Sequence, residues 1–218
     1  MNKKNLVVFA MAAICVAGLS ACGGKKEAET TVAETTVVET TVAETTVAET
    51  TAAETTAAAA VGEIDANGKF TSADGAYEIT LPAGWVVSPD SEEGLVCLTS
   101  ADEKDIIEII SENGDDAAAM LVTFPETAEE YNKSKEFPAK EITKYSIMKD
   151  AEEGVETFQI YSKFDKADGK TPYTFTALSG VQDATDKIYY AANALIQSEG
   201  MEDTITKTMD SFAMLNLQ

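Results

Sequence analysis

The sequence predicts an α+β domain in which an antiparallel β-sheet is flanked by helices. Two observations support this fold class. Between residues 70 and 196, short apolar or alternating runs are separated by turns of only a few polar residues, and such short connections join antiparallel neighbours. In addition, two segments carry the spacing and capping signals of helices. A meandering antiparallel sheet is the most economical arrangement of these strands.

The first expected strands are Phe70–Ser72 and Tyr77–Leu81, which alternate apolar and polar residues. The dipeptide Asp74-Gly75 between them is a hairpin turn signal. A further extended run begins at Trp85. The remaining expected strands are apolar runs bounded by polar turns, and they cover residues 95–99, 106–110, 141–148, 155–164, 173–181 and 187–196.

Two helices are expected beside the sheet. Thr127 and Glu130 have the spacing of a capping box, which predicts a helix over 126–137 that ends before a proline. Near the C-terminus, helical spacing relates Ile205, Met209 and Phe212. Residues 115–124 are ambiguous, because their alanines favour a helix and their later apolar residues favour a strand.

The chain divides into three parts: a leader over residues 1–21, a polar segment over 22–61, and a single domain over 62–218. Two lysines and an apolar run from Leu6 to Leu19 have the form of a secretory signal peptide. The following Leu19-Ser20-Ala21-Cys22 resembles the lipobox of bacterial lipoproteins. This resemblance implies cleavage between Ala21 and Cys22, lipidation of Cys22 and an outward-facing protein anchored at the cell membrane. An uncleaved anchor helix is the alternative, although the run is shorter than the roughly 20 residues that span a bilayer.

Residues 29–56 repeat a five-residue unit of Glu, two Thr and two small apolar residues. This period builds no apolar face in a helix, and in a strand it sends successive valines to opposite faces. The sequence therefore predicts a disordered, extended tether. O-glycosylation of the paired threonines, or adhesion through the repeat, is the functional alternative.

The charge of the domain limits its partners. Residues 62–218 contain 31 acidic residues against 12 lysines, a net charge of −19, which opposes binding to nucleic acid. The chain has no His and no Arg, which excludes Ser-His-Asp triads, His-ligated zinc and Arg clamps on phosphate. No cofactor and no metal site is expected. Cys97, the domain's one cysteine, reads as a buried strand residue without an intramolecular disulfide.

The remaining candidates for a site are acidic or aromatic. Three acidic turns, 65–68, 165–169 and 183–186, faintly resemble calcium loops but fit hairpin turns better. The pairs 92–93 and 102–103 are candidates for glycosidase carboxylates, which must lie roughly 5 to 10 Å apart. Two roles are open for the candidate aromatic residues, lining of a binding groove or ordinary core packing. These residues are Trp85, Tyr161, Tyr173, Tyr189 and Tyr190.

The segment Tyr77-Glu-Ile-Thr-Leu-Pro-Ala-Gly-Trp85 resembles the opening of PsbP-like domains, and Ile205 followed by Met209-Asp210-Ser211-Phe212 is similar to their terminal helix. The resemblance implies an antiparallel sheet flanked by helices and a binding or assembly role without a catalytic motif. We therefore expect a lipid-anchored, non-enzymatic module for an unknown protein or envelope ligand. A carboxylate-based hydrolase or carbohydrate-active enzyme is the alternative, and a two-lobed solute-binding protein is disfavoured by the size of the domain.

Overall fold

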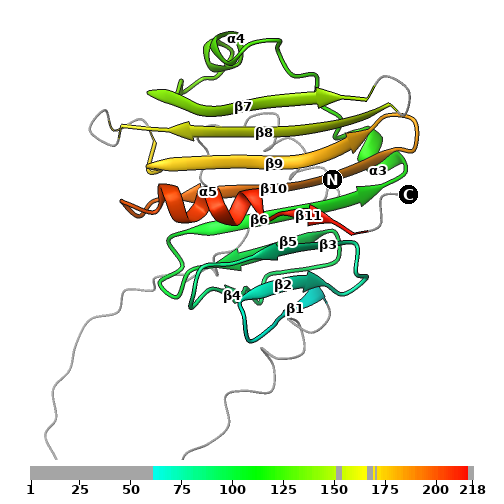
Figure 1. Ribbon diagram of the computed structural model, residues 1–218, viewed down its shortest axis with the longest axis vertical. Helices are drawn as coiled ribbons and strands as arrows, with labels where there is room; N and C mark the ends of the chain where they lie inside the picture. Colours follow the sequence, from blue (N-terminus) through cyan, green and yellow to red (C-terminus); the bar gives the residue numbers. More distant parts are fainter. Residues whose placement is uncertain (1–60, 151–153, 166–168, 170, 216–218) are drawn as a thin grey trace, which may run out of the picture.

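Antiparallel strands form most of the structure, a computed structural model that describes residues 61–150, 154–165, 169 and 171–215. The larger sheet has seven strands in the order β4-β5-β6-β10-β9-β8-β7 (Figure 1). In chain order these strands are β4 Val86–Val87, β5 Leu95–Thr99, β6 Ile106–Asn113, β7 Glu141–Lys149, β8 Val155–Lys163, β9 Phe175–Asp183 and β10 Ile188–Ile196.

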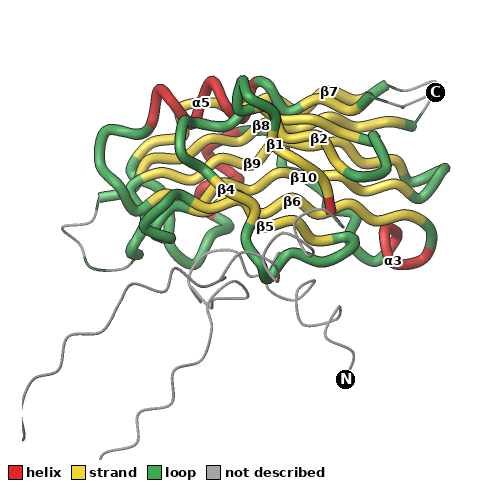
Figure 2. The backbone as a smooth tube through the Cα atoms, turned by 90° about the horizontal axis from the view of Figure 1, so that it is seen from below, coloured by secondary structure: helices red, strands yellow, loops and turns green. Residues whose placement is uncertain are grey.

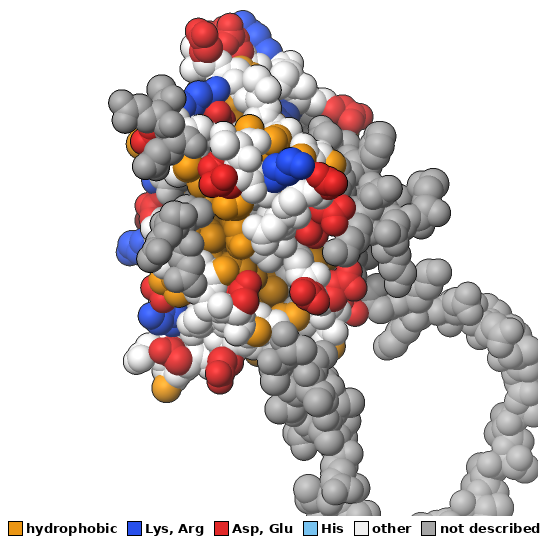
Figure 3. All heavy atoms as spheres, turned by 90° about the vertical axis from the view of Figure 1, so that its right-hand side faces the viewer, with side chains coloured by type: hydrophobic (Ala, Val, Ile, Leu, Met, Phe, Trp, Pro, Cys, Tyr) orange, Lys and Arg blue, Asp and Glu red, His pale blue; other side chains and the backbone are white. Residues whose placement is uncertain are grey.

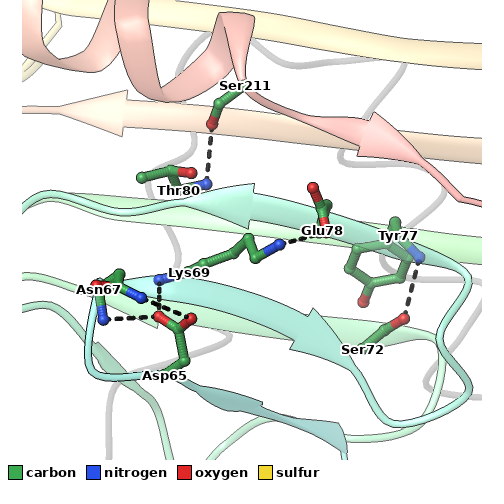
Figure 4. Close-up of polar contacts among 8 residues, drawn as sticks. All are labelled: Asp65, Asn67, Lys69, Ser72, Tyr77, Glu78, Thr80 and Ser211. Atoms are coloured by element: carbon green, nitrogen blue, oxygen red, sulfur yellow. Dashed lines mark hydrogen bonds and ion pairs between the residues drawn. The ribbon is translucent and has the colours of Figure 1, made fainter.

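A second, four-stranded sheet has the order β1-β2-β3-β11. Its strands are β1 Gly62–Ile64, β2 Lys69–Ser72, β3 Tyr77–Thr80 and β11 Ala213–Met214. Polar side chains fix its turns, as Figure 4 shows: the Ser72 hydroxyl accepts a hydrogen bond from the Tyr77 backbone N–H at 3.1 Å. The Ser211 hydroxyl accepts from the Thr80 N–H at 2.9 Å and so ties the end of α5 to β3.

The main core lies between the small sheet, one face of the large sheet and helix α5 (Glu202–Asp210). Helix α5 contacts β9, β10 and β3, and it buries Ile205, Thr208 and Met209. Trp85 is 7% exposed within this core, as its predicted packing role requires. This core therefore holds the small sheet and α5 on the same side of the large sheet.

The opposite face of the large sheet has a second apolar cluster, which includes Phe158 and Tyr189. The connection from β6 to β7 covers this face and contains the short helices α3 (Asp115–Ala118) and α4 (Ala128–Lys133). Figure 2 shows α3 and α5 on opposite sides of the strands. We call residues 119–140 of this connection the strap.

The structure confirms the predicted strands but corrects their arrangement and the helices. β4–β6 and β7–β10 are two separate meanders, because β10 pairs with β6 as well as with β9. The predicted capping box is present, since the Thr127 hydroxyl accepts from the Glu130 N–H at 3.2 Å, yet α4 ends at Lys133 rather than Phe137. Residues 121–124 form no strand. With helices this short, the flanking of the sheet by helices is only partial.

Candidate functional site: a cavity beneath the strap

A cavity of about 300 Å³ lies between the strap and the second face of the large sheet. Such a volume is at the lower end of the range for small-molecule sites. Its lining is largely aromatic and aliphatic, with Phe124, Tyr131, Phe137, Ile160, Phe164, Leu178 and Tyr189 among the contributing residues. The cavity can therefore bury an apolar group.

Two side-chain amides hold the strap in place. Gln182 of β9 accepts a hydrogen bond from the Val122 N–H at 2.9 Å and donates to the Val122 carbonyl at 2.7 Å. Within the strap, Asn132 of α4 donates to the Ala139 carbonyl at 3.0 Å and accepts from the Ala139 N–H at 2.7 Å. These paired bonds satisfy backbone groups that no strand or helix satisfies, so they fix the irregular chain above the cavity.

Aromatic contacts attach the strap to the sheet. The rings of Phe124 and Phe158 lie 4.9 Å apart, and those of Tyr131 and Tyr145 lie 5.6 Å apart. The Tyr145 hydroxyl also donates to the Pro125 carbonyl. Since Phe158 and Tyr145 belong to β8 and β7, the strap rests mainly on the second meander.

The strand register places polar groups along one end of the cavity. Asn193 of β10 is paired with Leu178 of β9, and Thr176, two residues before Leu178, is paired with Ser162 of β8. Side chains two residues apart share a face of a sheet. Ser162, Thr176 and Asn193 therefore all reach the cavity, and all three line it.

Asn193 is the most informative of these residues. The residue is 3% exposed, and its buried Nδ2 atom makes no hydrogen bond of ordinary length and angle. An unsatisfied buried donor costs about 1–3 kcal/mol.

Glu108 of β6 is the cross-strand neighbour of Asn193 on the other side. Burial raises the pKa of its carboxyl above the ordinary value of 4.5, and the nearby Asn193 amide lowers it only in part. The Asn193 amide therefore interacts with the Glu108 carboxyl, although its Nδ2 atom makes no hydrogen bond of ordinary length and angle. The cross-strand pairing thus places a carboxyl group with a raised pKa beside the buried Asn193 amide.

Cys97 of β5 pairs with Glu108 in the same row and is fully buried. Its burial agrees with the sequence-based prediction. The structure has Cys97 disulfide-bonded, however, so the expectation of a cysteine without a disulfide is wrong. The other cysteines, Cys15 and Cys22, lie outside the described residues.

Two of the three acidic segments form hydrogen-bonded turns and not calcium loops. Asp65 accepts from the backbone N–H groups of Asn67 and Lys69 at 2.8 and 2.9 Å, as Figure 4 shows. Asp183 accepts from those of Thr185 and Asp186 at 2.6 and 3.0 Å. Most of the third turn, 165–169, falls outside the described residues. Within the part of the chain that the structure describes, no group of three His, Cys, Asp or Glu side chains could hold a metal ion.

The candidate glycosidase carboxylates are not brought together. Residues 92–93 precede β5 and residues 102–103 follow it, so the length of the strand, about 13 Å at 3.3 Å per residue, separates them. Asp102 instead accepts from Ser100 and Lys104 at 2.8 and 2.7 Å. The Lys104 ammonium, followed by the Ser100 hydroxyl, lowers the pKa of Asp102 to about 2. A carboxyl group with so low a pKa holds a turn together as a carboxylate and does not act as a proton donor.

Most of the candidate aromatic residues are packing residues. Trp85, Tyr161 and Tyr190 belong to the main core, and the Tyr161 hydroxyl donates to Asp210 at 2.7 Å. Tyr173 is partly buried. Tyr189 alone among the five lines the cavity, and burial raises its pKa to about 12.

The sequence-based reasoning missed Asn193. One signal for it was present: the strand Ile188–Ile196 reads Ile-Tyr-Tyr-Ala-Ala-Asn-Ala-Leu-Ile, in which a single amide interrupts an otherwise apolar or aromatic run. A polar side chain in such a strand must find a partner or face a cavity. The predicted lipidation and cleavage residues, Cys22 and Ala21, lie outside the described residues, and in the described part of the chain no helix is long and apolar enough to cross a membrane.

Comparisons with known proteins give a faint likeness. No protein-family model and no curated protein matches the sequence. The solution structure of cyanobacterial PsbP (CyanoP) from Synechocystis sp. PCC 6803 aligns with 71% of this chain and 96% of its own, at 12% identity and a TM-score of 0.42. A crystal structure from Bacteroides thetaiotaomicron VPI-5482 aligns with 69% of this chain and 49% of its own, at 14% identity and a TM-score of 0.38. Both scores are too low to establish a shared fold.

Proposed function

We propose that this chain is an outward-facing lipoprotein, held at the bacterial cell membrane by a lipid on Cys22, whose domain of residues 62–218 binds a ligand without catalysis. The ligand site is the cavity beneath the strap. The observation that carries the proposal is the cavity itself, whose largely apolar wall includes the polar residues Ser162, Thr176 and Asn193. A few polar groups in an apolar wall suit recognition, because they fix the orientation of a bound ligand.

The surroundings of the amide favour binding over chemistry. Burial and the Asn193 amide account for the pKa of Glu108, and no second carboxylate in the described part of the chain contributes to it. A glycosidase needs two carboxyl groups with separate roles. The chain also supplies no His to act as a general base. A binding or assembly role, as in the PsbP-like domains that the two ends of the domain resemble, is consistent with this chemistry.

A carboxylate-based hydrolase is the second candidate, and one observation favours it. A carboxyl group with a raised pKa is a common feature of catalytic sites, and Glu108, the cross-strand neighbour of the cavity-lining Asn193, has this property. Its single carboxyl group would have to act with a hydroxyl such as that of Thr176, which lines the cavity.

A substrate panel separates the two candidates. The complete chain is incubated with glycan, ester, peptide and phosphate substrates, beside Glu108→Gln and a matched control, Glu63→Gln, at an exposed position of β1. We expect no turnover by any of the three proteins. Turnover that persists in Glu63→Gln but disappears in Glu108→Gln would replace the binding module with an enzyme.

The anchor is tested separately by detergent phase separation and by the mass of the mature N-terminal peptide. We expect wild type to enter the detergent phase, Cys22→Ala to remain in the aqueous phase, and Cys22 to have the added mass of a diacylglyceryl group. One sulfur atom cannot hold both this lipid and a disulfide. A peptide in which Cys22 is linked to Cys97 would therefore contradict the lipid anchor.

A further inference from the structure

We propose that the cavity beneath the strap holds one unbranched acyl chain of a single-chain amphiphile such as a fatty acid, with the polar head at the end of the cavity near Lys135. This inference rests on the proposed function, since it names the class of ligand for the same cavity. Three properties of the described residues carry it: the long form of the cavity, the difference between its two ends and the position of its one cation.

The strap is tied to the large sheet at two points that lie far apart along the strands. At the first tie, Val122 forms its paired hydrogen bonds with Gln182, which is the register neighbour of Glu156 on β8. At the second tie, the Lys140 N–H donates to the Lys163 carbonyl of β8 at 2.8 Å. Lys163 is seven positions after Glu156, which corresponds to about 23 Å along the strand. Strap residues next to both ties line the cavity, so its volume of about 300 Å³ forms a long and narrow space.

Such a space suits an unbranched hydrocarbon chain better than a ring system. The middle of its wall is aliphatic, since Ile160 and Leu178 are paired in the register of β8 and β9 and both line the cavity. A methylene group has nearly the volume of a water molecule in the liquid, about 30 Å³. The cavity therefore has room for roughly ten carbon atoms, and each methylene that it takes out of water adds to the affinity.

The two ends of the cavity differ in polarity. Near the first tie, the wall contains the buried rings of Phe124 and Tyr189, and Tyr189 is paired with Gln182. Nearer the second tie, Ser162 of β8 and Thr176 of β9 are paired in the register, and both line the cavity. An amphiphile therefore gains most when its methyl end lies at the rings and its polar head lies at the hydroxyl groups.

Lys135 gives the polar end of the cavity a positive charge. It lies in the strap segment that Asn132 closes by its bonds to Ala139, and its Nζ atom is 4.1 Å from the centre of the Tyr131 ring. Of the described residues that line the cavity, only Lys135 is charged. The protein is otherwise acidic, with a net charge of −19 over residues 62–218, and Figure 3 shows acidic side chains around a central group of hydrophobic side chains on one face. A carboxylate head is therefore favoured at this end of the cavity.

A series of probes tests the length and the shape of the ligand. The protein is residues 22–218 with Cys22→Ser, so that no lipid of its own competes for the cavity. Affinities are measured by NMR titration with hexanoate, octanoate, decanoate and dodecanoate, each below its micelle concentration, beside 2-naphthoate, a ring compound with the same head. We expect the affinity to rise about two- to fourfold per methylene, the value of burying that group, and to level off near ten carbons. Decanoate should bind more tightly than 2-naphthoate and should shift the methyl signals of Leu178.

One pair of variants shows whether the chain lies on the sheet beneath the strap. Leu178→Phe fills the middle of the cavity, so we expect decanoate to lose its advantage over octanoate. Gln159→Phe is the matched control, because Gln159 is one residue before Ile160 on β8 and so faces the other side of the sheet. It should keep the length dependence of wild type. Thermal unfolding confirms that both variants fold, and the probe series on wild type tests the proposal independently of them.

A second pair of variants locates the head. Lys135→Gln removes the charge at the polar end, so we expect the affinity for decanoate to fall about two- to fivefold, the value of one exposed ion pair. The affinity for 1-decanol, which has no charge, should stay unchanged. Lys133→Gln is the matched control on the same segment, because the Lys133 ion pair with Glu129 is exposed and Lys133 does not line the cavity.

Several results would overturn the proposal. An affinity that does not depend on chain length, tighter binding of 2-naphthoate than of decanoate, or an unchanged length dependence in folded Leu178→Phe would each show that the cavity does not hold an acyl chain. Failure of every probe to bind would show the same. An equal effect of Lys135→Gln on decanoate and 1-decanol would contradict the position of the head. None of these results produces turnover, so they remain distinct from the failure of the non-catalytic role, which the substrate panel detects.

Discussion

Gly180, at the middle of β9, lies where three elements meet. In the register of the large sheet it stands between Phe158 of β8 and Ala191 of β10. A Cβ atom at this position would lie 2.4 Å from the Tyr190 carbonyl oxygen, 2.7 Å from Phe158 Cζ and 2.9 Å from Ala191 Cα. Two of these three atoms belong to the backbone of β10, so they cannot move without disturbing the strand pairing.

We therefore expect Gly180→Ala to lower the free energy of unfolding by about 1–3 kcal/mol, the usual cost of overpacking a closely packed site. For a domain of this size each kcal/mol corresponds to about 2–4 °C in Tm. The measurement is urea denaturation followed by Trp85 fluorescence, with thermal unfolding beside it. Gly200→Ala is the control, since its Cβ would meet nothing within 4 Å and only its left-handed backbone costs about 1–2 kcal/mol.

A double-mutant cycle with Phe158→Leu separates the ring from the backbone. If the ring causes most of the crowding, the double variant should be more stable than the two single costs predict, by about 0.5 kcal/mol or more. If the Tyr190 carbonyl dominates, the costs should add. A loss below about 0.5 kcal/mol in Gly180→Ala alone would refute the reasoning, because β10 would then yield more easily than a paired central strand should.

Three further outcomes are expected. Gln182→Leu, which removes both bonds to Val122, should cost about 1–3 kcal/mol and speed amide exchange at Val122; unchanged exchange would show that the amide does not hold the strap. Glu108→Gln should stabilise the domain at neutral pH, because a pKa raised by burial above 4.5 makes the wild-type unfolding free energy fall as pH rises through that window. The gain should vanish near pH 4 in denaturation series, and a gain independent of pH would contradict it. Trp85→Ala should cost about 3–5 kcal/mol in urea denaturation, given the 7% exposure of Trp85; a cost below about 1 kcal/mol would contradict its packing role.

The strands were the most predictable part of the fold, because their signal is local. The run Tyr77–Leu81 alternates apolar and polar residues, and the structure forms β3 over Tyr77–Thr80. The order of the strands was not predictable in the same way. Turn chemistry indicates which consecutive strands pair, but the pairing of β6 with β10 joins residues about 80 positions apart, and no local pattern specifies it.

The strap shows why residues 115–124 were ambiguous. Phe124 is buried against Phe158, so its apolar character serves to cover a sheet face and not to continue a strand. The capping signal at Thr127 was local and was therefore predictable. The length of α4 was not predictable from the sequence. The helix ends at Ser134, whose hydroxyl donates to the Tyr131 carbonyl at 2.7 Å.

In the sequence, the candidate site beneath the strap is marked only by one polar residue in an apolar strand. Asn193 breaks an apolar strand, which signals a polar requirement on one face of β10. Which residues complete the site depends on the register with β9 and β6 and on the path of the strap. Those contacts are long-range, so composition and periodicity could not supply them.

The pairing between β6 and β10 also has a consequence for the route by which the chain folds. Closing a loop of about 80 residues costs roughly 4 kcal/mol in chain entropy on the logarithmic scale, against about 1 kcal/mol for a four-residue turn. We therefore expect the two meanders to form early and to join late. The strap and strands β8, β9 and β10 line the cavity, and none of its lining residues belongs to β4–β6, so the cavity can form before that last step.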